Sequence, residues 1–254
     1  MLITQQLSVY AYQKTLLKNI NLQLKPATLY GLIGHNGSGK STLIKALSGN
    51  IKPSDGKVLL DGQNLHDLSP KLLAKQLAYL PQKLPEQAGF STKELVMLGR
   101  YPHQSFLSRP SEQDYQLVEK AMAVTGVAPF AAASLATLSG GEKARAWLAM
   151  CLAQKTPYLL LDEPLAPLDI VYQVQILELI QRLAHEQGLC VVVIIHDINL
   201  ASQFCDEIIA LKGGELVYQG DAQTLMNAET LHDIFGIRLT LLTHPTTGKQ
   251  VAVV

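Results

Sequence analysis

The chain has 254 residues, and its 21 Lys and Arg balance 21 Asp and Glu, so its formal net charge is zero. Because binding to nucleic acid depends on neutralising phosphates with basic side chains, this balance argues against a nucleic-acid-binding protein. Hydrophobic residues make up 48% of the sequence, yet no uninterrupted apolar run approaches the roughly 18 residues of a membrane-spanning helix.

The N-terminus and the cysteines both favour a cytoplasmic chain. The first ten residues lack a basic segment followed by an apolar stretch and a cleavage site, so we expect no signal peptide. The cysteines, Cys151, Cys190 and Cys205, are odd in number, and their spacing fits neither a zinc site nor a disulfide framework. We expect them to be reduced and packed in the core.

The first predicted elements are strands followed by a glycine-rich turn and a helix. The stretch LSVYAY and residues 16–24 alternate apolar and polar side chains, as strands exposed on one face do. Residues 29–33 form a short apolar run that ends at Gly34, which is typical of a buried parallel strand. A helix is predicted from Ser41 to about Gly49.

The turn between this strand and this helix matches the P-loop pattern G-x-x-x-x-G-K-[ST]. Glycines let backbone N–H groups surround a phosphate, the helix N-terminus adds positive potential, Lys40 can reach the β- and γ-phosphate oxygens, and Ser41 can ligate Mg²⁺. The alternative is a glycine turn with a surface lysine, which the placement between strand and helix disfavours. The predicted nucleotide-binding residues here are Gly34, His35, Asn36, Gly37, Ser38, Gly39, Lys40, Ser41 and Thr42.

The middle of the chain is predicted to be mostly helical. Ser69 and Pro70 form a cap and a first turn for a helix through Ala78. Residues 83–156 then show helical spacing, with capping boxes that start at Ser91 and Ser139 and a further cap at Ser111.

Two apolar strands return after this helical region. Residues 158–161 lead into Asp162 and Glu163, and residues 190–195 lead into His196, with a helix predicted between them over 171–187. This alternation predicts an α/β fold with a mostly parallel sheet flanked by helices. The last residues, 237–254, are predicted to form two strands around a Pro/Gly turn.

The acidic pair at the end of the first of these strands is a candidate catalytic element. A strand that delivers a carboxylate to its C-terminal end places it where open α/β sheets bind ligands. Asp162 would hold Mg²⁺ and Glu163 would polarise the attacking water. Taken alone, the pair could equally be an acidic strand end, but a P-loop earlier in the chain favours catalysis.

The sequence Leu138-Ser139-Gly140-Gly141-Glu142 allows two interpretations. Ser139 and Glu142 can form a capping box with no further role. However, glycines are poor helix formers, and two of them at a helix start make sense if an anion approaches the backbone N–H groups. A second phosphate-binding element suggests one nucleotide held from two sides.

LSGGE between the P-loop and LLLDEP, together with Gln82 and His196 after apolar strands, resembles the ATP-binding subunit of ABC transporters over nearly the whole chain. The stretches GLIGHNGSGKSTL, YLPQKLP, GRYP, ARAWLAM and HDINLA resemble in particular the ATPases of bacterial ferric-siderophore importers of the ferric-hydroxamate type. This resemblance implies a P-loop NTPase of RecA-like fold with an N-terminal antiparallel β part and an inserted helical subdomain. The chain would be one ATP-binding domain, with its α/β core at 1–82 and 157–254 and its helical subdomain at 83–156.

The resemblance also implies roles for single residues. The chain would form a head-to-tail homodimer in which Ser139, Gly140 and Gly141, followed by Glu142, contact ATP bound to the P-loop of the other copy. Gln82 would sense Mg²⁺ or the attacking water, His196 would hold the γ-phosphate and position Glu163, and Asp169 would lie at the dimer contact. Lys40 and Mg²⁺ would compensate charge during hydrolysis.

Adenine stacking is where the sequence departs from the resembled family. The aromatic position expected near the N-terminus falls on Ala11, between Tyr10 and Tyr12. Tyr12 is the candidate that we favour.

The implied function is that of a peripheral ATPase at the cytoplasmic face of a bacterial inner membrane. It would power uptake of an iron(III)-siderophore complex through a permease, which contacts the helical subdomain and receives its cargo from a periplasmic binding protein. Uptake of another metal chelate, such as vitamin B12 or haem, is an alternative. A soluble ABC ATPase acting on nucleic acid and a P-loop kinase are further alternatives; the first would favour a basic surface, and the second leaves LSGGE and His196 unexplained.

Overall fold

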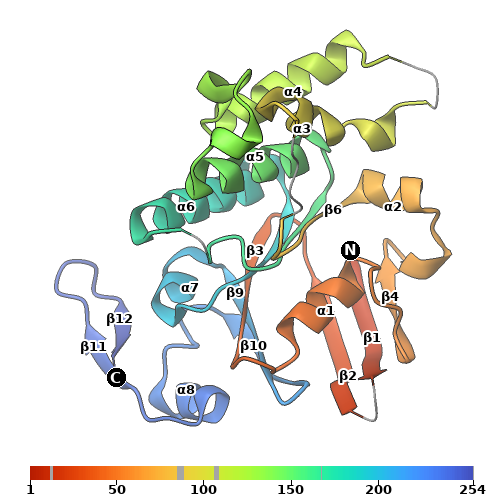
Figure 1. The fold of residues 1–254 in the computed structure, drawn as a ribbon. Coiled ribbons are helices and arrows are strands. Elements are labelled where there is room, and N and C mark those ends of the chain that lie inside the picture. Colours follow the sequence, from red (N-terminus) through yellow and green to blue (C-terminus); the bar gives the residue numbers. More distant parts are fainter. Residues whose placement is uncertain (12–13, 85–88, 106–108, 167, 254) are drawn as a thin grey trace. The chain divides into compact units, whose positions relative to one another are not determined.

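The computed structural model describes residues 1–11, 14–84, 89–105, 109–166 and 168–253. The chain consists of two compact units. The first consists of Met1–Leu68 and Leu183–Val254, and the second of Ser69–Arg182. Figure 1 shows the elements of both units along the chain.

The first unit is mainly a β structure with short helices. Its elements are β1 (Leu2–Ala11), β2 (Lys14–Leu24), β3 (Thr28–Ile33), α1 (Lys40–Leu47), β4 (Asp55–Leu60), β5 (Gln63–Asn64), β8 (Cys190–Ile194), α7 (Ile198–Phe204), β9 (Glu207–Lys212), β10 (Glu215–Asp221), α8 (Ala228–Phe235), β11 (Thr240–Thr243) and β12 (Gln250–Val253).

The N-terminal strands form an antiparallel sheet in the order β2-β1-β4-β5. Along β2, the apolar side chains of Leu17, Ile20, Leu22 and Leu24 are buried while the residues between them are mostly exposed. This alternation is that of a sheet with one solvated face, and it confirms the predicted N-terminal strands.

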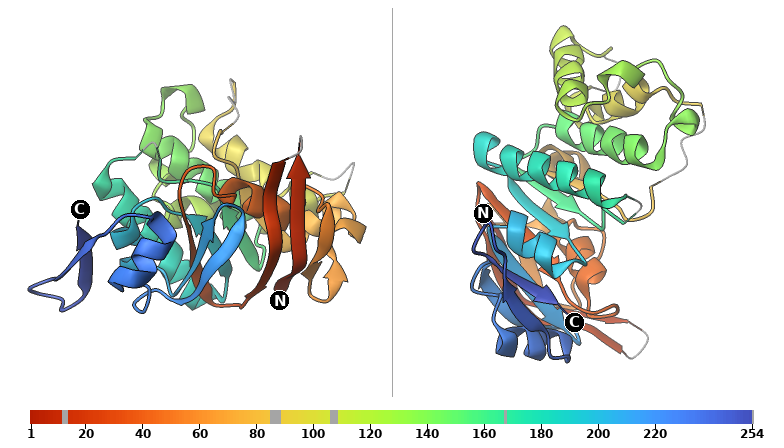
Figure 2. Two further views of the ribbon diagram at one scale, coloured as in Figure 1. Left: turned by 90° about the horizontal axis from the view of Figure 1, so that it is seen from below. Right: turned by 90° about the vertical axis from the view of Figure 1, so that its left-hand side faces the viewer.

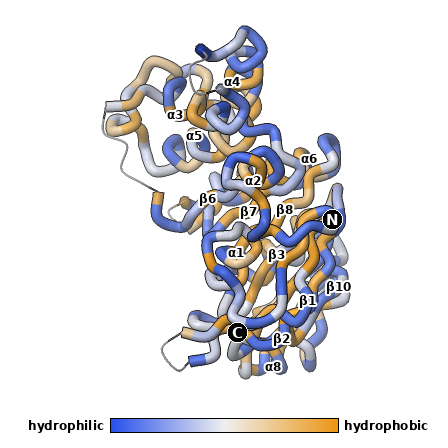
Figure 3. Tube along the Cα trace, turned by 90° about the vertical axis from the view of Figure 1, so that its right-hand side faces the viewer, coloured by the Kyte–Doolittle hydropathy of each residue, from blue (hydrophilic) through white to orange (hydrophobic). Residues whose placement is uncertain are grey.

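The strands that lead to the P-loop and to His196 are neighbours. β3 pairs in parallel with both β8 and β9, and all five residues of β8 are buried. Figure 3 shows hydrophobic colouring along β3 and β8, as expected for strands covered on both faces. α1 follows β3 directly and contacts β8, so the predicted order of buried strand, glycine turn and helix is confirmed.

The predicted C-terminal pair of strands is also confirmed. β11 and β12 are antiparallel, with Thr240 opposite Val253 and Thr243 opposite Gln250. They form a separate two-stranded sheet that contacts α7.

The second unit is mainly helical. Its elements are α2 (Pro70–Gln76), β6 (Leu77–Leu80), α3 (Thr92–Leu98), α4 (Glu112–Val124), α5 (Gly140–Ala153), β7 (Tyr158–Leu161) and α6 (Ile170–Gln187), whose last turn lies beyond the unit boundary.

The helix predicted from Pro70 through Ala78 is too long, because α2 ends at Gln76. The next residues form β6, in which Leu77 pairs with Tyr158 and Leu80 with Leu161 of the parallel strand β7. Leu77, Ala78 and Leu80 are all buried. Pairing of this apolar run with β7 therefore overrides the helical spacing of the sequence.

Helices α3, α4 and α5 pack against one another, and Figure 2 shows this group from two further sides. Each begins with a capping box, built by Ser91 with Glu94, by Ser111 with Asp114 and by Ser139 with Glu142. The two predicted boxes are confirmed, and the cap predicted at Ser111 is a full box as well.

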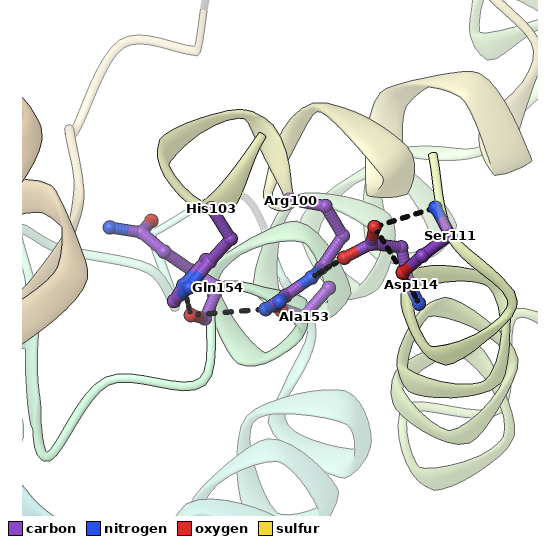
Figure 4. Close-up of polar contacts among 6 residues, drawn as sticks. All are labelled: Arg100, His103, Ser111, Asp114, Ala153 and Gln154. Atoms are coloured by element: carbon purple, nitrogen blue, oxygen red, sulfur yellow. Dashed lines mark hydrogen bonds and ion pairs between the residues drawn. The ribbon is translucent and has the colours of Figure 1, made fainter. Parts of the chain in front are cut away.

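A buried ion pair ties these three helices together. Nε of Arg100, just after α3, donates to Oδ1 of Asp114 at 2.8 Å, and the same guanidinium donates to the carbonyl oxygen of Ala153 at 2.7 Å (Figure 4). Ser111 N and Oγ also donate to Asp114. Although burial alone would raise the pKa of Asp114, these bonds and the positive charge of Arg100 lower it from 3.8 to about 2.

The cysteines match the expectation drawn from their spacing. Cys151, Cys190 and Cys205 are free and buried. Burial raises the pKa of the Cys151 and Cys190 thiols to about 12, so these thiols are protonated and unreactive in the folded chain.

Among the helices of the described residues, none combines the length and the apolar character that crossing a membrane requires.

Candidate functional site

The P-loop of the first unit has the geometry of a phosphate cradle. Lys40 is buried, and its Nζ donates to the carbonyl oxygens of Gly34 and His35 at 2.7 and 2.9 Å. These bonds fold the lysine side chain back over the loop that it follows. A cation held there by two backbone carbonyls is placed to exchange them for phosphate oxygens.

Two glycines of this loop cannot be replaced without displacing backbone. Gly34 has φ +139°, and a Cβ there would overlap the carbonyl oxygen of Leu211. Gly39 has φ +106°, and a Cβ there would lie 2.8 Å from the carbonyl oxygen of Leu16. The loop conformation therefore requires glycine at the two positions that the sequence pattern specifies.

The loop also holds an orphaned polar atom. Oγ of Ser38 is buried and has no hydrogen-bond partner among the described residues. An unsatisfied hydroxyl of this kind costs about 1–3 kcal/mol, which a bound phosphate oxygen would recover. This observation and the lysine geometry fit the binding of a nucleotide phosphate.

His196 lies at the same end of the first unit's parallel strands as the P-loop. Leu32 of β3 is paired with Ile194 of β8, and Ile195 N donates to the carbonyl oxygen of Leu32. Because Gly34 follows β3 and His196 follows β8, both leave neighbouring parallel strands at their carboxyl ends. His196 is exposed there, as a residue that contacts a ligand must be.

The second unit brings the predicted Gln82 and Glu163 into contact. Nε2 of Gln82 donates to Oε2 of Glu163 at 2.6 Å. The contact follows from the parallel pairing of β6 and β7, since Gln82 lies just beyond one strand and Glu163 just beyond the other.

Asp162 is held by a residue that the sequence analysis missed. It is 1% exposed, and its Oδ2 accepts a hydrogen bond of 3.2 Å from the hydroxyl of Tyr79 in β6. Burial and the negative charge of Asp162 both raise the pKa of Tyr79, so the phenol remains a donor at neutral pH. The signal available in the sequence was a tyrosine within an apolar strand that precedes Gln82.

Glu163 has an unusual backbone. Its φ is +53°, in the left-handed region that residues other than glycine seldom adopt. Such a conformation costs on the order of 1 kcal/mol and recurs at functional sites.

The chain offers oxygen ligands suited to Mg²⁺ in both units, the Ser41 hydroxyl at the start of α1 and the Asp162 carboxylate after β7. Among the described residues, no group of three or more His, Cys, Asp or Glu could hold a metal ion.

The predicted signature residues form the start of α5. The hydroxyl of Ser139 accepts from Glu142 N at 3.3 Å and donates to Oε2 of Glu142 at 2.8 Å. The hydrogen bonds from Ser139 lower the pKa of Glu142. Ser139, Gly140 and Gly141 lie at a helix N-terminus, where backbone N–H groups attract anions, so capping and phosphate binding are compatible there.

Asp169 caps the next helix and is linked to α5 through Tyr172. Oδ1 of Asp169 accepts from Tyr172 N at 3.1 Å. The Tyr172 ring lies 5.5 Å from the Arg145 guanidinium, and a Cβ on Gly141 would lie 3.7 Å from the same ring. The second unit thus connects its predicted dimer contact with its predicted signature turn. Tyr172 and Arg145 were not among the predicted residues.

The predicted residues therefore fall into two groups. The first unit holds the P-loop and His196; the second holds Gln82, Asp162, Glu163, the signature residues and Asp169. Tyr12, the candidate for adenine stacking, lies outside the described residues.

Residues 17–166 match the protein family described as ABC transporter. The petrobactin import ATP-binding protein of Bacillus anthracis is 42% identical over 225 residues, which are 89% of this chain and 83% of that protein. The iron(3+)-hydroxamate import ATP-binding protein of Bacillus subtilis is 39% identical, with 98% of this chain and 93% of that protein covered. The ferric enterobactin transport ATP-binding protein of Escherichia coli is 37% identical, with 98% and 92% covered.

Two further similarities concern an import protein with a different cargo and a solved structure. A cobalamin import ATP-binding protein of Halobacterium salinarum is 38% identical over 92% of this chain and 58% of its own length. Among solved structures, an ATP-binding cassette in a dimeric post-hydrolysis state, bound to ADP and phosphate, aligns with a TM-score of 0.77 at 27% identity, covering 87% of this chain and 99% of that one.

Proposed function

This chain belongs to the ABC transporter family, and we propose that it is the ATP-hydrolysing subunit of a bacterial importer for an iron(III)-siderophore complex. The likeness of nearly its whole length to the petrobactin, hydroxamate and enterobactin import proteins carries the choice of cargo. A hydroxamate siderophore is the cargo that we favour.

In this proposal the P-loop binds ATP. The backbone N–H groups of the loop surround the phosphates, Lys40 moves from the carbonyl oxygens of Gly34 and His35 to the β- and γ-phosphates, and Ser38 gains a partner. Ser41, Asp162 and Gln82 would hold Mg²⁺ together with the nucleotide, and the ion would supply positive charge that offsets the charge developing on the phosphates. The same loop that the glycines shape thus fixes the γ-phosphate for attack.

Glu163 acts as the general base that orients and deprotonates the attacking water. The hydrogen bond from Gln82 supports this role because it restricts the carboxylate to one position. His196 holds the γ-phosphate oxygens. The left-handed backbone of Glu163 is a strained conformation of the kind that recurs at functional sites.

The working unit is a head-to-tail homodimer in which Ser139, Gly140 and Gly141 of one copy contact ATP on the P-loop of the other. The dimeric relative bound to ADP and phosphate supports dimerisation. We further propose that the dimer sits peripherally at the cytoplasmic face of the inner membrane, on a permease that contacts the helical residues 83–156. A periplasmic siderophore-binding protein delivers the cargo, and nucleic acid is not a partner.

A growth experiment tests the cargo. The encoding gene is deleted from its host, and growth is measured on single iron sources, with one hydroxamate, one catecholate and one carboxylate siderophore in separate cultures and an inorganic iron salt as control. Loss of growth on the hydroxamate alone, restored by the wild-type gene but not by a Lys40→Ala gene, is the expected result. Unchanged growth on every siderophore would refute an iron importer.

Cobalamin uptake is the second candidate, because a cobalamin import protein shares 38% identity with this chain. The same deletion strain, made dependent on external cobalamin, separates the two cargoes. A growth defect limited to low cobalamin would replace the siderophore proposal.

A further inference from the structure

The C-terminal hairpin is attached to the helix that follows His196 by one side chain. Nδ2 of Asn199 in α7 donates to the carbonyl oxygen of Ala252 at 3.0 Å, and Oδ1 of Asn199 accepts from Ala252 N at 2.8 Å. Ala252 lies in β12 and is 8% exposed. Figure 1 shows the hairpin of β11 and β12 beside α7.

The chemistry of this contact is specific to an amide. A side-chain amide carries one donor and one acceptor, so Asn199 satisfies both backbone groups of Ala252 as a neighbouring strand would. A carboxylate could accept but not donate, and an apolar side chain could do neither. Since a two-stranded hairpin is at best marginally stable by itself, this pair of bonds is an anchor for it.

The same residue is built into the turn that carries His196. Asp197 caps α7, and its Oδ1 accepts from Asn199 N at 2.8 Å and from Leu200 N at 3.1 Å. His196 directly precedes this cap. α7 has only seven residues, so its first turn depends on its cap and on contacts with its surroundings.

We propose that Asn199 is a positioning residue for His196, and that the C-terminal hairpin holds it in place. The hairpin fixes Asn199, Asn199 fixes the first turn of α7, and that turn sets the direction in which His196 leaves β8. This inference rests on the proposed contact of His196 with the γ-phosphate.

Loss of the bonds between Asn199 and Ala252 should slow hydrolysis without weakening ATP binding, because neither bond involves a residue of the P-loop. In Asn199→Leu, which has similar volume but no hydrogen-bonding atoms, we expect kcat to fall about tenfold and KM for ATP to stay within about twofold. Asn199→Asp keeps the acceptor for Ala252 N but loses the donor to the Ala252 carbonyl oxygen. Its kcat should lie between those of the wild type and Asn199→Leu.

Asn227→Leu is the matched control. Asn227 lies in the same unit, and its side chain accepts from the backbone N–H groups of Glu229 and Thr230 at the start of α8. The same substitution there removes two side-chain bonds to backbone away from His196. It should lower the melting temperature by a similar amount and leave kcat unchanged.

The experiment measures steady-state ATP hydrolysis by the full chain for wild type, Asn199→Leu, Asn227→Leu and His196→Ala, and for the double variant of His196 and Asn199. If Asn199 acts through His196, adding Asn199→Leu to His196→Ala should change the residual kcat by less than about twofold. Hydrogen exchange of a peptide covering 195–204 should accelerate in Asn199→Leu and not in Asn227→Leu.

The outcomes separate the two proposals. Wild-type kcat in His196→Ala would refute the role proposed for His196 itself. A slow His196→Ala beside a wild-type kcat in Asn199→Leu would overturn the positioning role alone. An equal loss of kcat on adding Asn199→Leu to either background would also overturn it, because Asn199 would then act independently of His196.

Discussion

The side-chain amide of Gln82 donates a 2.6 Å hydrogen bond to the carboxylate of Glu163. The two residues are 81 positions apart in the chain, and the parallel pairing of β6 with β7 brings them together. The bond orients the carboxylate of the proposed general base, so the preorganisation of this carboxylate depends on a glutamine.

Gln82→Ala should therefore slow hydrolysis more than it weakens ATP binding. We expect kcat to fall by about tenfold or more, since a mobile base spends less time oriented toward the attacking water, and KM to change little. Steady-state ATPase assays check this, with Lys83→Ala, a change at the exposed neighbouring residue, as control. Equal kcat in the two variants would contradict a positioning role for Gln82.

Glu163→Gln should abolish turnover while ATP still binds. The amide has almost the same shape but cannot accept a proton, so kcat should fall by about 10²–10⁴-fold. Because hydrolysis no longer separates the two copies, size-exclusion chromatography with ATP should show a trapped dimer. Glu178→Gln, at an exposed position in α6, is the control and should remain monomeric and active under the same conditions.

Ser139→Arg distinguishes phosphate contact from helix capping. A bulky cation at this helix start should block approach of the other copy's ATP and stop hydrolysis. Ser91→Arg removes the same type of capping box, built there by Ser91 with Glu94, from another helix of the same unit. Both variants should lose about 1 kcal/mol of stability, but only Ser139→Arg should lose activity. If the two variants retain equal specific activity, Ser139 is only a cap.

The buried pair of Arg100 and Asp114 should make the second unit sensitive to acid. The pKa of Asp114 is lowered from 3.8 to about 2, so its charge stabilises the folded chain above about pH 4 and this stabilisation is lost as pH falls toward 2. The contribution is of order 2 kcal/mol. Denaturant unfolding of wild type and Asp114→Asn between pH 2 and 7 measures it.

For Asp114→Asn, the difference in unfolding free energy from wild type should be largest at neutral pH and should shrink below pH 4. A difference that does not change with pH would show that the charge of Asp114 is unimportant. Arg100→Ala should be more harmful, about 3–5 kcal/mol at neutral pH, because it leaves the Asp114 carboxylate buried without its partner.

The parts of the fold that the sequence predicted are those governed by local patterns. Residues close together in the sequence are enough to predict the alternation in β2 and the apolar runs of β3, β7 and β8. The same holds for the capping boxes that start at Ser91 and Ser139.

The helix after Ser69 was predicted two residues too long, through Ala78, because β7, the strand that pairs with Leu77 and Ala78, is distant in the chain. Strand β4 was not assigned because it pairs with β1, which is distant in the chain. Strands β9 and β10 were also not assigned, although they form a hairpin across Gly213 and Gly214, a local turn signal in the sequence.

The candidate site divides in the same way. Motifs named the residues that are expected to carry charge or to bind phosphate, and the structure brings two of them, Gln82 and Glu163, into contact. Spacing could not identify the residues that support them. These supporting contacts depend on which side chains the fold places together. They are the hydrogen bond from Tyr79 to Asp162, the contacts of Tyr172 with Asp169 and Arg145, and the hydrogen bond from Asn199 to Ala252.

The positive φ of Glu163 implies that this position trades stability for activity. Glycine tolerates the left-handed region without steric cost, so Glu163→Gly should match or exceed the wild-type melting temperature, with up to about 1 kcal/mol of strain removed. The same variant should not hydrolyse ATP. A screen for thermostable variants of this chain would therefore accept a substitution here that a screen for uptake would reject.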